Sequence, residues 1–134
     1  MQIDITTVER AVLASFLFDN TQFEELEFLV KIEDFFLKAH QEVFRVMQWL
    51  HANNLPIEET FLLRYINKNN ATEQDLINIM SSNAISNLSS YIDLIKEEST
   101  KRKLNTLSIE IKNDLSNELI LVDEIKSKIV NYID

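Results

Sequence analysis

The sequence contains no glycine, and Pro56 is its only proline. Glycine supplies the positive-φ positions of tight hairpin turns and proline interrupts helices, so a chain nearly without either residue favours helical segments. The absence of glycine also excludes a P-loop and a dinucleotide-binding fingerprint, because both need glycine at fixed positions. We therefore expect an all-α fold that does not bind ATP in the P-loop manner.

The remaining composition narrows the class of protein further. A chain of 134 residues can bury a core without disulfides or metals, and the lack of cysteine is typical of a reducing compartment. There is no signal-peptide pattern and no apolar run approaching the roughly 20 residues of a membrane span, so we expect a cytoplasmic protein outside the membrane. The net charge of -9 repels phosphate backbones, so contact with DNA is expected only through partners.

Two capping boxes are predicted at the beginnings of the first two helices. In each, a threonine precedes a glutamate by three residues: Thr6 before Glu9, and Thr21 before Glu24. In such a box the hydroxyl and the carboxylate each accept a hydrogen bond from the backbone N–H of the other residue. Apolar residues follow both patterns, which predicts a first helix that is largely buried and a short second helix that is buried on one side.

Three further helices are expected before residue 83. One follows Asp34-Phe35-Phe36 and ends near Asn53-Asn54, one follows Pro56, and one begins at Thr72. Trp49 is predicted to be a core residue in the first of these three. The other inward-facing residues, spaced at helical intervals, are Val43, Phe44, Met47, Leu50, Phe61, Leu62, Tyr65 and Ile66. The last of the three helices contains Leu76, Ile77 and Met80.

The last third of the chain is predicted to be an antiparallel helical hairpin. One long helix runs from about Leu88 to Leu115, and a second from about Leu121 to Ile133. We expect residues 1–86 to form a compact globular head of several helices and residues 87–134 to form the hairpin. The second arm is apolar on more than one side, and an isolated hairpin of this size is marginal in water. Burying four or five such side chains would contribute about 10 kcal/mol, comparable with the cost of association, so dimerisation through the hairpin is plausible.

No arrangement of residues in the sequence indicates catalysis or a metal site. Neither His40 nor His51 has a glutamate three residues before it, so the Glu-x-x-His pairs of di-iron bundles are absent. His40 is expected to make backbone or solvent contacts at the beginning of its helix, and His51 to be exposed near the end. The basic run at residues 101–103 follows Glu97 and Glu98, which favours salt bridges or an interface contact over phosphate binding.

Three ordered blocks of sequence carry a family resemblance. They comprise Val8 to Leu13; then Glu33 to Phe36, His40 to Phe44, Leu50 and Leu55 to Ile57; and finally Asn87, Tyr91, Ile95, Ser99, Arg102 and Leu104. In order and spacing they resemble the N-terminal domain family of DnaB-type replicative helicases. The positions that follow the family pattern most clearly are Glu9, Ala11, Val12, Leu13, Asp34, Phe35, Phe36, His40, Phe44, Pro56, Ile57 and Tyr91. The chain departs from the pattern at Gln41 and Glu58, and it lacks the glycine usual before the Pro-Ile pair.

The resemblance implies the N-terminal assembly and primase-docking domain of a hexameric helicase that unwinds duplex DNA. The partners are then a second copy of the chain, in a trimer of dimers, and primase, with a helicase loader in some members. No cofactor is expected in this segment, since ATP and Mg²⁺ would bind a RecA-like motor domain that follows it. The residues predicted to pair two hairpins are Ile95, Arg102, Leu107, Val122, Ile125, Ile129 and Tyr132, with Arg102 as a polar contact that sets the register.

Two alternatives from other classes remain at this point. One is a stand-alone helical adaptor or regulator that binds helicase or primase without a motor domain. The other is an all-helical enzyme or metal carrier, which would have to contain bound metal.

Overall fold

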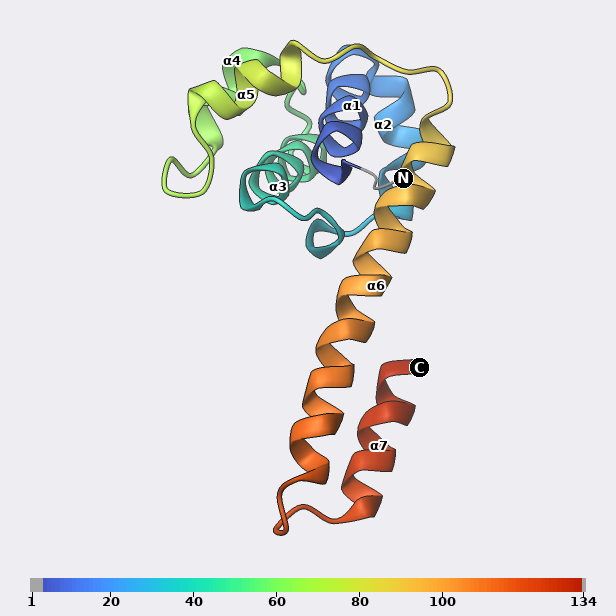
Figure 1. The fold of residues 1–134 in the computed structure, drawn as a ribbon. Coiled ribbons are helices and arrows are strands. Elements are labelled where there is room, and N and C mark those ends of the chain that lie inside the picture. Colours follow the sequence, from blue (N-terminus) through green and yellow to red (C-terminus); the bar gives the residue numbers. More distant parts are fainter. Residues whose placement is uncertain (1–3, 134) are drawn as a thin grey trace. The chain divides into compact units, whose positions relative to one another are not determined.

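A computed structural model describes residues 4–133, and every regular element among them is a helix. The elements are α1 (Ile5–Phe18), α2 (Asn20–Leu26), η1 (Glu27–Leu29), η2 (Ile32–Asp34), α3 (Lys38–Ala52), α4 (Glu59–Tyr65), α5 (Glu73–Met80), α6 (Leu88–Leu115) and α7 (Val122–Ile133) (Figure 1). The predicted all-α class is confirmed, and both long C-terminal helices lie where the sequence places them.

The chain divides into two compact units, and the division falls inside α6. Residues up to Ser99 form the first unit, here called the head, and residues from Thr100 onward form the second, here called the hairpin. The head therefore extends beyond the predicted boundary at residue 86. The reason is a stripe on the first turns of α6, formed by Leu88, Ile92 and Ile95, which is buried in the head core.

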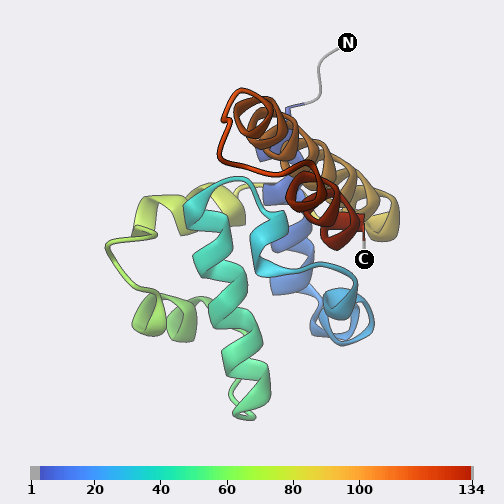
Figure 2. The same ribbon diagram turned by 90° about the horizontal axis from the view of Figure 1, so that it is seen from below.

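Aromatic side chains form the centre of the head. Phe16, Phe23 and Phe44 lie within 6.2 Å of one another between ring centroids, and the Phe35 ring lies 5.0 Å from that of Phe44, tilted by 43°. All four rings are fully buried. They come from α1, α2, α3 and the segment before α3, so burial of these rings holds the head helices together. Figure 2 shows α1 and α3 side by side within the head.

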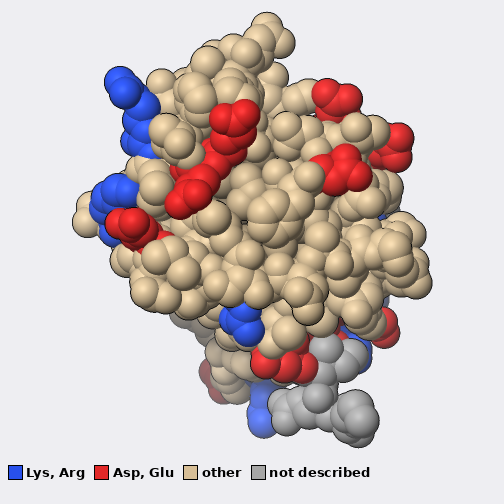
Figure 3. All heavy atoms as spheres, turned by 90° about the horizontal axis from the view of Figure 1, so that it is seen from above, with Lys and Arg blue, Asp and Glu red and all other residues tan. Residues whose placement is uncertain are grey.

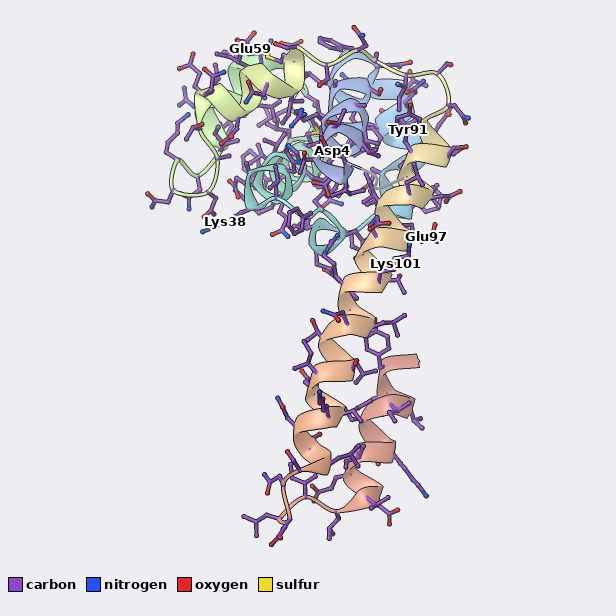
Figure 4. The ribbon with its side chains drawn as sticks, viewed as in Figure 1. Asp4, Lys38, Glu59, Tyr91, Glu97 and Lys101 are labelled. Atoms are coloured by element: carbon purple, nitrogen blue, oxygen red, sulfur yellow. The ribbon has the colours of Figure 1, made fainter. Side chains whose placement is uncertain are left out.

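Aspartates, rather than the predicted threonine boxes, cap the first two helices. Asp4, which is labelled in Figure 4, accepts a hydrogen bond from the Thr6 backbone N–H, and Asp19 accepts one from the Thr21 N–H. Each helix therefore begins earlier than the box pattern predicts. The predicted capping box of Thr6 and Glu9 does not form, because the Glu9 side chain is buried and accepts hydrogen bonds from other residues.

After the end of α3, Asn54 occupies the left-handed backbone position at which helices most often have glycine. Its φ of 57° lies in the left-handed region, which asparagine tolerates better than most residues. The N–H of Leu55 donates to the Leu50 carbonyl at 2.9 Å, and that of Asn54 donates to His51 at 3.2 Å. This pair of bonds is a Schellman motif, so the chain closes a helix in the usual way without glycine.

Two residues predicted to face the core are exposed instead. Trp49 is 40% exposed and Tyr65 37%, and Ile77 on α5 is also 43% exposed. Trp49 lies about 130° around the helix from the middle of the face that carries Met47 and Leu50, at about 100° per residue. The helices α4 and α5 are only about two turns long, so each buries a narrow stripe.

Candidate subunit interface

Ion pairing and packing within the hairpin confirm that its two helices are antiparallel. Near the turn, Lys128 Nζ lies 2.6 Å from a carboxylate oxygen of Asp114 and 3.8 Å from one of Glu110. At the other end, the Tyr132 hydroxyl donates to the Thr100 carbonyl at 3.5 Å. The hydrogen bond from Lys128 to Asp114 raises the pKa of the lysine. Because the Lys128 side chain is still 40% exposed to solvent, this pair fixes the register of the two helices more than it stabilises them.

Several residues predicted to join two copies belong to the seam of a single hairpin. Ile125 is only 6% exposed, and Leu107, Ile129 and Tyr132 are half-buried. Ile129 and Tyr132 lie on the same face of α7 as Ile125. Lys128 lies on this face too, and its contact with Asp114 shows that the face is turned toward α6. Figure 4 shows side chains filling the space between the two helices. These residues therefore hold the hairpin together before any second chain binds.

Ile95 is excluded from the predicted interface. Its side chain is fully buried in the head core, so no apolar surface is left there for another chain. The prediction was wrong at this position because helical periodicity does not reveal which neighbour covers a face. Arg102, by contrast, is half-buried.

The hairpin exposes a large set of apolar side chains. Of the predicted interface residues, Val122 belongs to it, being 62% exposed. The other exposed members are Leu104, Ile109, Leu115, Leu119, Leu121 and Val130, at 49–89%. The expected surplus of apolar surface is thus present on both helices and on the turn between them. Sequence reasoning missed Ile109, which lies outside the stripe of α6 that carries Leu104 and Ile111.

Charge is distributed unevenly between the two units. Residues 100–134 contain six basic and six acidic side chains, whereas residues 1–99 contain seven basic and sixteen acidic ones. The entire net charge of -9 therefore belongs to the head, and the hairpin is neutral. Two hairpins can approach each other without net repulsion, while the head attracts cationic partners.

A buried carboxylate joins α1 to the beginning of α3. Glu9 is fully buried and accepts hydrogen bonds from the Phe36 N–H at 2.6 Å and the Leu37 N–H at 3.4 Å. The His40 ring nitrogen Nδ1 lies 2.7 Å from the same carboxylate. His40 is only 3% exposed, so the expectation that it makes backbone or solvent contacts was wrong. His51 is exposed, as predicted.

A second buried carboxylate joins α6 to the head. Asp34 accepts a hydrogen bond from the Ser99 hydroxyl at 2.8 Å and another from the Lys31 backbone N–H at 2.9 Å. Elsewhere in the same unit, the Ser15 hydroxyl accepts a hydrogen bond from the Ile85 N–H at 3.0 Å. The bonds of Ser99 to Asp34 and of Ile85 to Ser15 connect residues 65 and 70 positions apart in the sequence, so they specify the tertiary structure of the head.

A family model, the DnaB-like helicase N terminal domain, matches residues 2–97. The chain belongs to this DnaB-like family. The replicative DNA helicase DnaB of Helicobacter pylori strain J99 is 30% identical over 131 residues, which are 97% of this chain and 26% of the helicase. DnaB of Buchnera aphidicola is 27% identical over 77% of this chain and 24% of its own length. The chain spans about a quarter of the length of these relatives.

Solved structures of DnaB N-terminal domains have the same fold. The domain from Helicobacter pylori, determined in work on its interactions with primase, superposes with a TM-score of 0.80 at 29% identity. That match covers 84% of this chain and 93% of the other. The domain from Mycobacterium tuberculosis gives a TM-score of 0.81 at 17% identity, over 93% of this chain and 96% of the other.

The positions of the DnaB-like pattern are mostly structural in this chain. Glu9, Asp34 and His40 form the buried hydrogen bonds described above. Val12, Leu13, Phe35, Phe44 and Ile57 are core residues, Ala11 and Tyr91 are half-buried, and Phe36 and Pro56 are exposed. Over residues 4–133, no three His, Asp or Glu side chains gather as a metal site would require, and no helix is long and apolar enough to cross a membrane.

Proposed function

We propose that this chain is the assembly and docking domain of a hexameric replicative DNA helicase. In this proposal the hairpin pairs with a second copy, the paired domains form a trimer of dimers, and the head docks primase. Unwinding of duplex DNA, with ATP and Mg²⁺, belongs to the motor domain of the full helicase. The observation that carries the proposal is membership of the DnaB-like family together with a neutral hairpin that exposes apolar side chains on both helices.

Energetics favour pairing through the hairpin. Burying one exposed leucine, isoleucine or valine contributes about 1.5–3 kcal/mol, and seven such side chains are at least 49% exposed in the hairpin. Even half of them would offset much of the rigid-body cost of association. Because residues 100–134 carry no net charge, little electrostatic repulsion opposes the contact.

Sedimentation equilibrium tests the pairing. Wild-type protein is expected to be a dimer or larger assembly, and the double variant Ile109→Asp, Val130→Asp is expected to weaken association by at least about 100-fold, since two apolar contacts are replaced by charges. These positions are preferable to Ile125, because a charge in the seam would unfold the hairpin itself.

Asn105→Asp with Asn131→Asp is the matched control. Both asparagines are exposed on the same two helices, so this variant adds the same charges and removes no apolar group. Its mass should equal that of the wild type. Equal masses for all three proteins would contradict pairing through this surface.

Docking of primase is tested separately. The Helicobacter pylori domain was studied for its interactions with primase, and the acidic head here suits a cationic partner. Calorimetric titration with the C-terminal region of the cognate primase should show saturable binding that weakens as salt rises. The pairing-deficient variant should also bind, because its head is unchanged. If neither the wild type nor this variant gave a heat of binding with primase, the docking role would be contradicted.

A further inference from the structure

A cavity of about 520 Å³ opens on the head beside α1. One wall is formed by the first turns of α1 with its N-cap Asp4, another by the segment between α5 and α6, and Tyr91 of α6 completes the lining. Figure 4 labels Asp4, before α1, and Tyr91, on α6. The volume lies within the range of about 300–1,000 Å³ that is usual for small-molecule sites. The cavity is built from head residues alone, so it is separate from the hairpin surface proposed to pair.

Part of the lining is apolar. Val8, Ala11, Ile85 and Tyr91 line the cavity and are half-buried, so each keeps apolar surface in contact with solvent. Covering such surface with hydrocarbon contributes about 25 cal/mol per Å² of apolar area removed from water. A ligand that suits this cavity therefore has a hydrocarbon part.

Two serine hydroxyls in the lining present only lone pairs to a ligand. Ser81 Oγ donates its proton to the Ile77 carbonyl at 2.8 Å, and Ser82 Oγ donates to the Asn78 carbonyl at 3.3 Å. A carbonyl oxygen can only accept, so the direction of both hydrogen bonds is fixed. Each hydroxyl is then left as an acceptor.

The carboxylate of Asp4 adds a charged acceptor. The hydroxyls of Thr6 and Thr7 donate to it at 2.7 and 2.8 Å, and the Thr6 backbone N–H donates at 3.2 Å. The hydrogen bonds of the two hydroxyls, that of Thr6 first, hold the pKa of Asp4 below its usual range. An ionised carboxylate has about four acceptor positions, so the three bonds leave one for a ligand.

Little other charge surrounds the cavity. Asp4 alone is charged among the described residues that line it, and residues 81–92 contain no charged side chain. The segment between α5 and α6 crosses the top of the head in Figure 1, and the view from above in Figure 3 shows mostly uncharged side chains there. Arg10 donates to Thr7 Oγ1 at 3.1 Å and offsets part of the Asp4 charge. The C-terminal end of α5, by contrast, adds partial negative charge beside the two serines.

The direction of these hydrogen bonds selects a donor as ligand. Among the described lining residues, only the Asn83 amide and the Tyr91 hydroxyl have side-chain protons to offer an anion. An ammonium group carries three donors and a positive charge, which match the Asp4 carboxylate and the serine lone pairs. We propose that this cavity binds a small organic amine, with its ammonium group donating to Asp4 and its hydrocarbon part against Val8, Ala11 and Tyr91.

Nuclear magnetic resonance titration of the ¹⁵N-labelled chain tests the proposal. The probes are hexylammonium, hexanol and hexanoate, which share one hydrocarbon chain and differ in charge. Hexylammonium is expected to shift the amide signals of Thr7, Ala11 and Ile85 saturably. Hexanol should bind at least about tenfold more weakly, because it supplies one uncharged donor in place of three charged ones. Hexanoate should leave these signals unchanged.

Two variants separate the charge of Asp4 from its role as a cap. Asp4→Asn removes the charge and keeps a good N-cap, and it should weaken hexylammonium binding at least about fivefold. Asp19→Asn is the matched control, because Asp19 caps α2 in the same way and does not line the cavity. It should bind hexylammonium like the wild type. Circular dichroism verifies that both variants fold.

A tripeptide with lysine between two alanines carries the same ammonium group on a polypeptide, and it should bind more weakly than hexylammonium. Tighter binding of this peptide would overturn the assignment of the cavity to a small molecule. Equal binding of hexanol and hexylammonium, unchanged binding by Asp4→Asn, or shifts that avoid the cavity residues would overturn the proposal as a whole. Sedimentation and the primase titration measure hairpin pairing and primase docking independently of these outcomes.

Discussion

Glu9 is the residue whose role changed most between sequence and structure. In the sequence it completes a capping pattern with Thr6, whereas in the folded head its carboxylate receives the Phe36 and Leu37 N–H groups and faces His40. One carboxylate thus provides acceptors for donors more than 25 residues away along the chain. A buried backbone N–H that loses its acceptor costs free energy, which makes Glu9 important for stability.

Glu9→Gln is expected to destabilise the protein by about 2–4 kcal/mol. An amide has one acceptor oxygen where the carboxylate has two, so at least one buried donor loses its partner at about 1–3 kcal/mol, and the amide NH2 group then faces a donor. Urea unfolding monitored by circular dichroism measures the change.

Glu25→Gln serves as the control, because Glu25 is exposed on α2 and its change should stay within about 0.5 kcal/mol. If the two variants were equally stable, the three contacts of Glu9 would contribute little.

At the scale of single helices, local sequence predicted that helices exist but not how they begin. A Thr-x-x-Glu pattern occurs at both α1 and α2, yet an aspartate two residues earlier accepts the first backbone N–H in each case. Either residue type can cap a helix, and the choice depends on where the preceding chain turns away. At α5 the box does form, with Thr72 accepting from the Asp75 N–H and Asp75 accepting from the Thr72 N–H.

Asp19→Ala is predicted to destabilise the head by about 1 kcal/mol, within the usual range of about 0.5–2 kcal/mol for removal of an N-cap. Thr21→Ala should change stability by less than about 0.5 kcal/mol, since Thr21 contributes a backbone donor and not the cap. Thermal unfolding of the two variants side by side measures the difference. A larger loss for Thr21→Ala would restore the box originally predicted for α2.

At the scale of the whole molecule, charge placement along the hairpin suggests how two copies align. Residues 101–103 are all basic, whereas residues 115–124, in and beside the turn, contain three acidic side chains and no basic one. If two turns met, like charges would face one another, while an antiparallel arrangement would place each turn against the basic end of the other copy. Charge pairs near a protein surface contribute little affinity but do select an orientation.

Cross-linking tests this antiparallel pairing. The chain has no cysteine, so Lys103→Cys in one copy and Glu124→Cys in another introduce unique thiols. A mixture of the two variants, treated with a short thiol-reactive cross-linker, should give covalent dimers. Leu119→Cys, in the turn, should give few dimers with itself. Predominant cross-linking between two Leu119→Cys chains would indicate the parallel arrangement instead.

The sequence alone determined the all-helical class, the bounds of α3, α6 and α7, and the surplus apolar surface of the hairpin. These features follow from helical periodicity and from the lack of glycine, which act over a few neighbouring residues. The family resemblance could also be recognised from the sequence, because the three matching segments contain core residues in a fixed order.

Only the tertiary structure decided which faces are covered and by what. Ile95 lies in the head core and Ile125 in the hairpin seam, whereas Trp49 and Ile109 are exposed, although all four are apolar residues on predicted helices. Burial depends on segments that pack from distant parts of the chain, and periodicity carries no information about them. For the same reason the hydrogen bonds of Glu9 could not be predicted, because its partners lie beside it only once α1 and α3 have packed together.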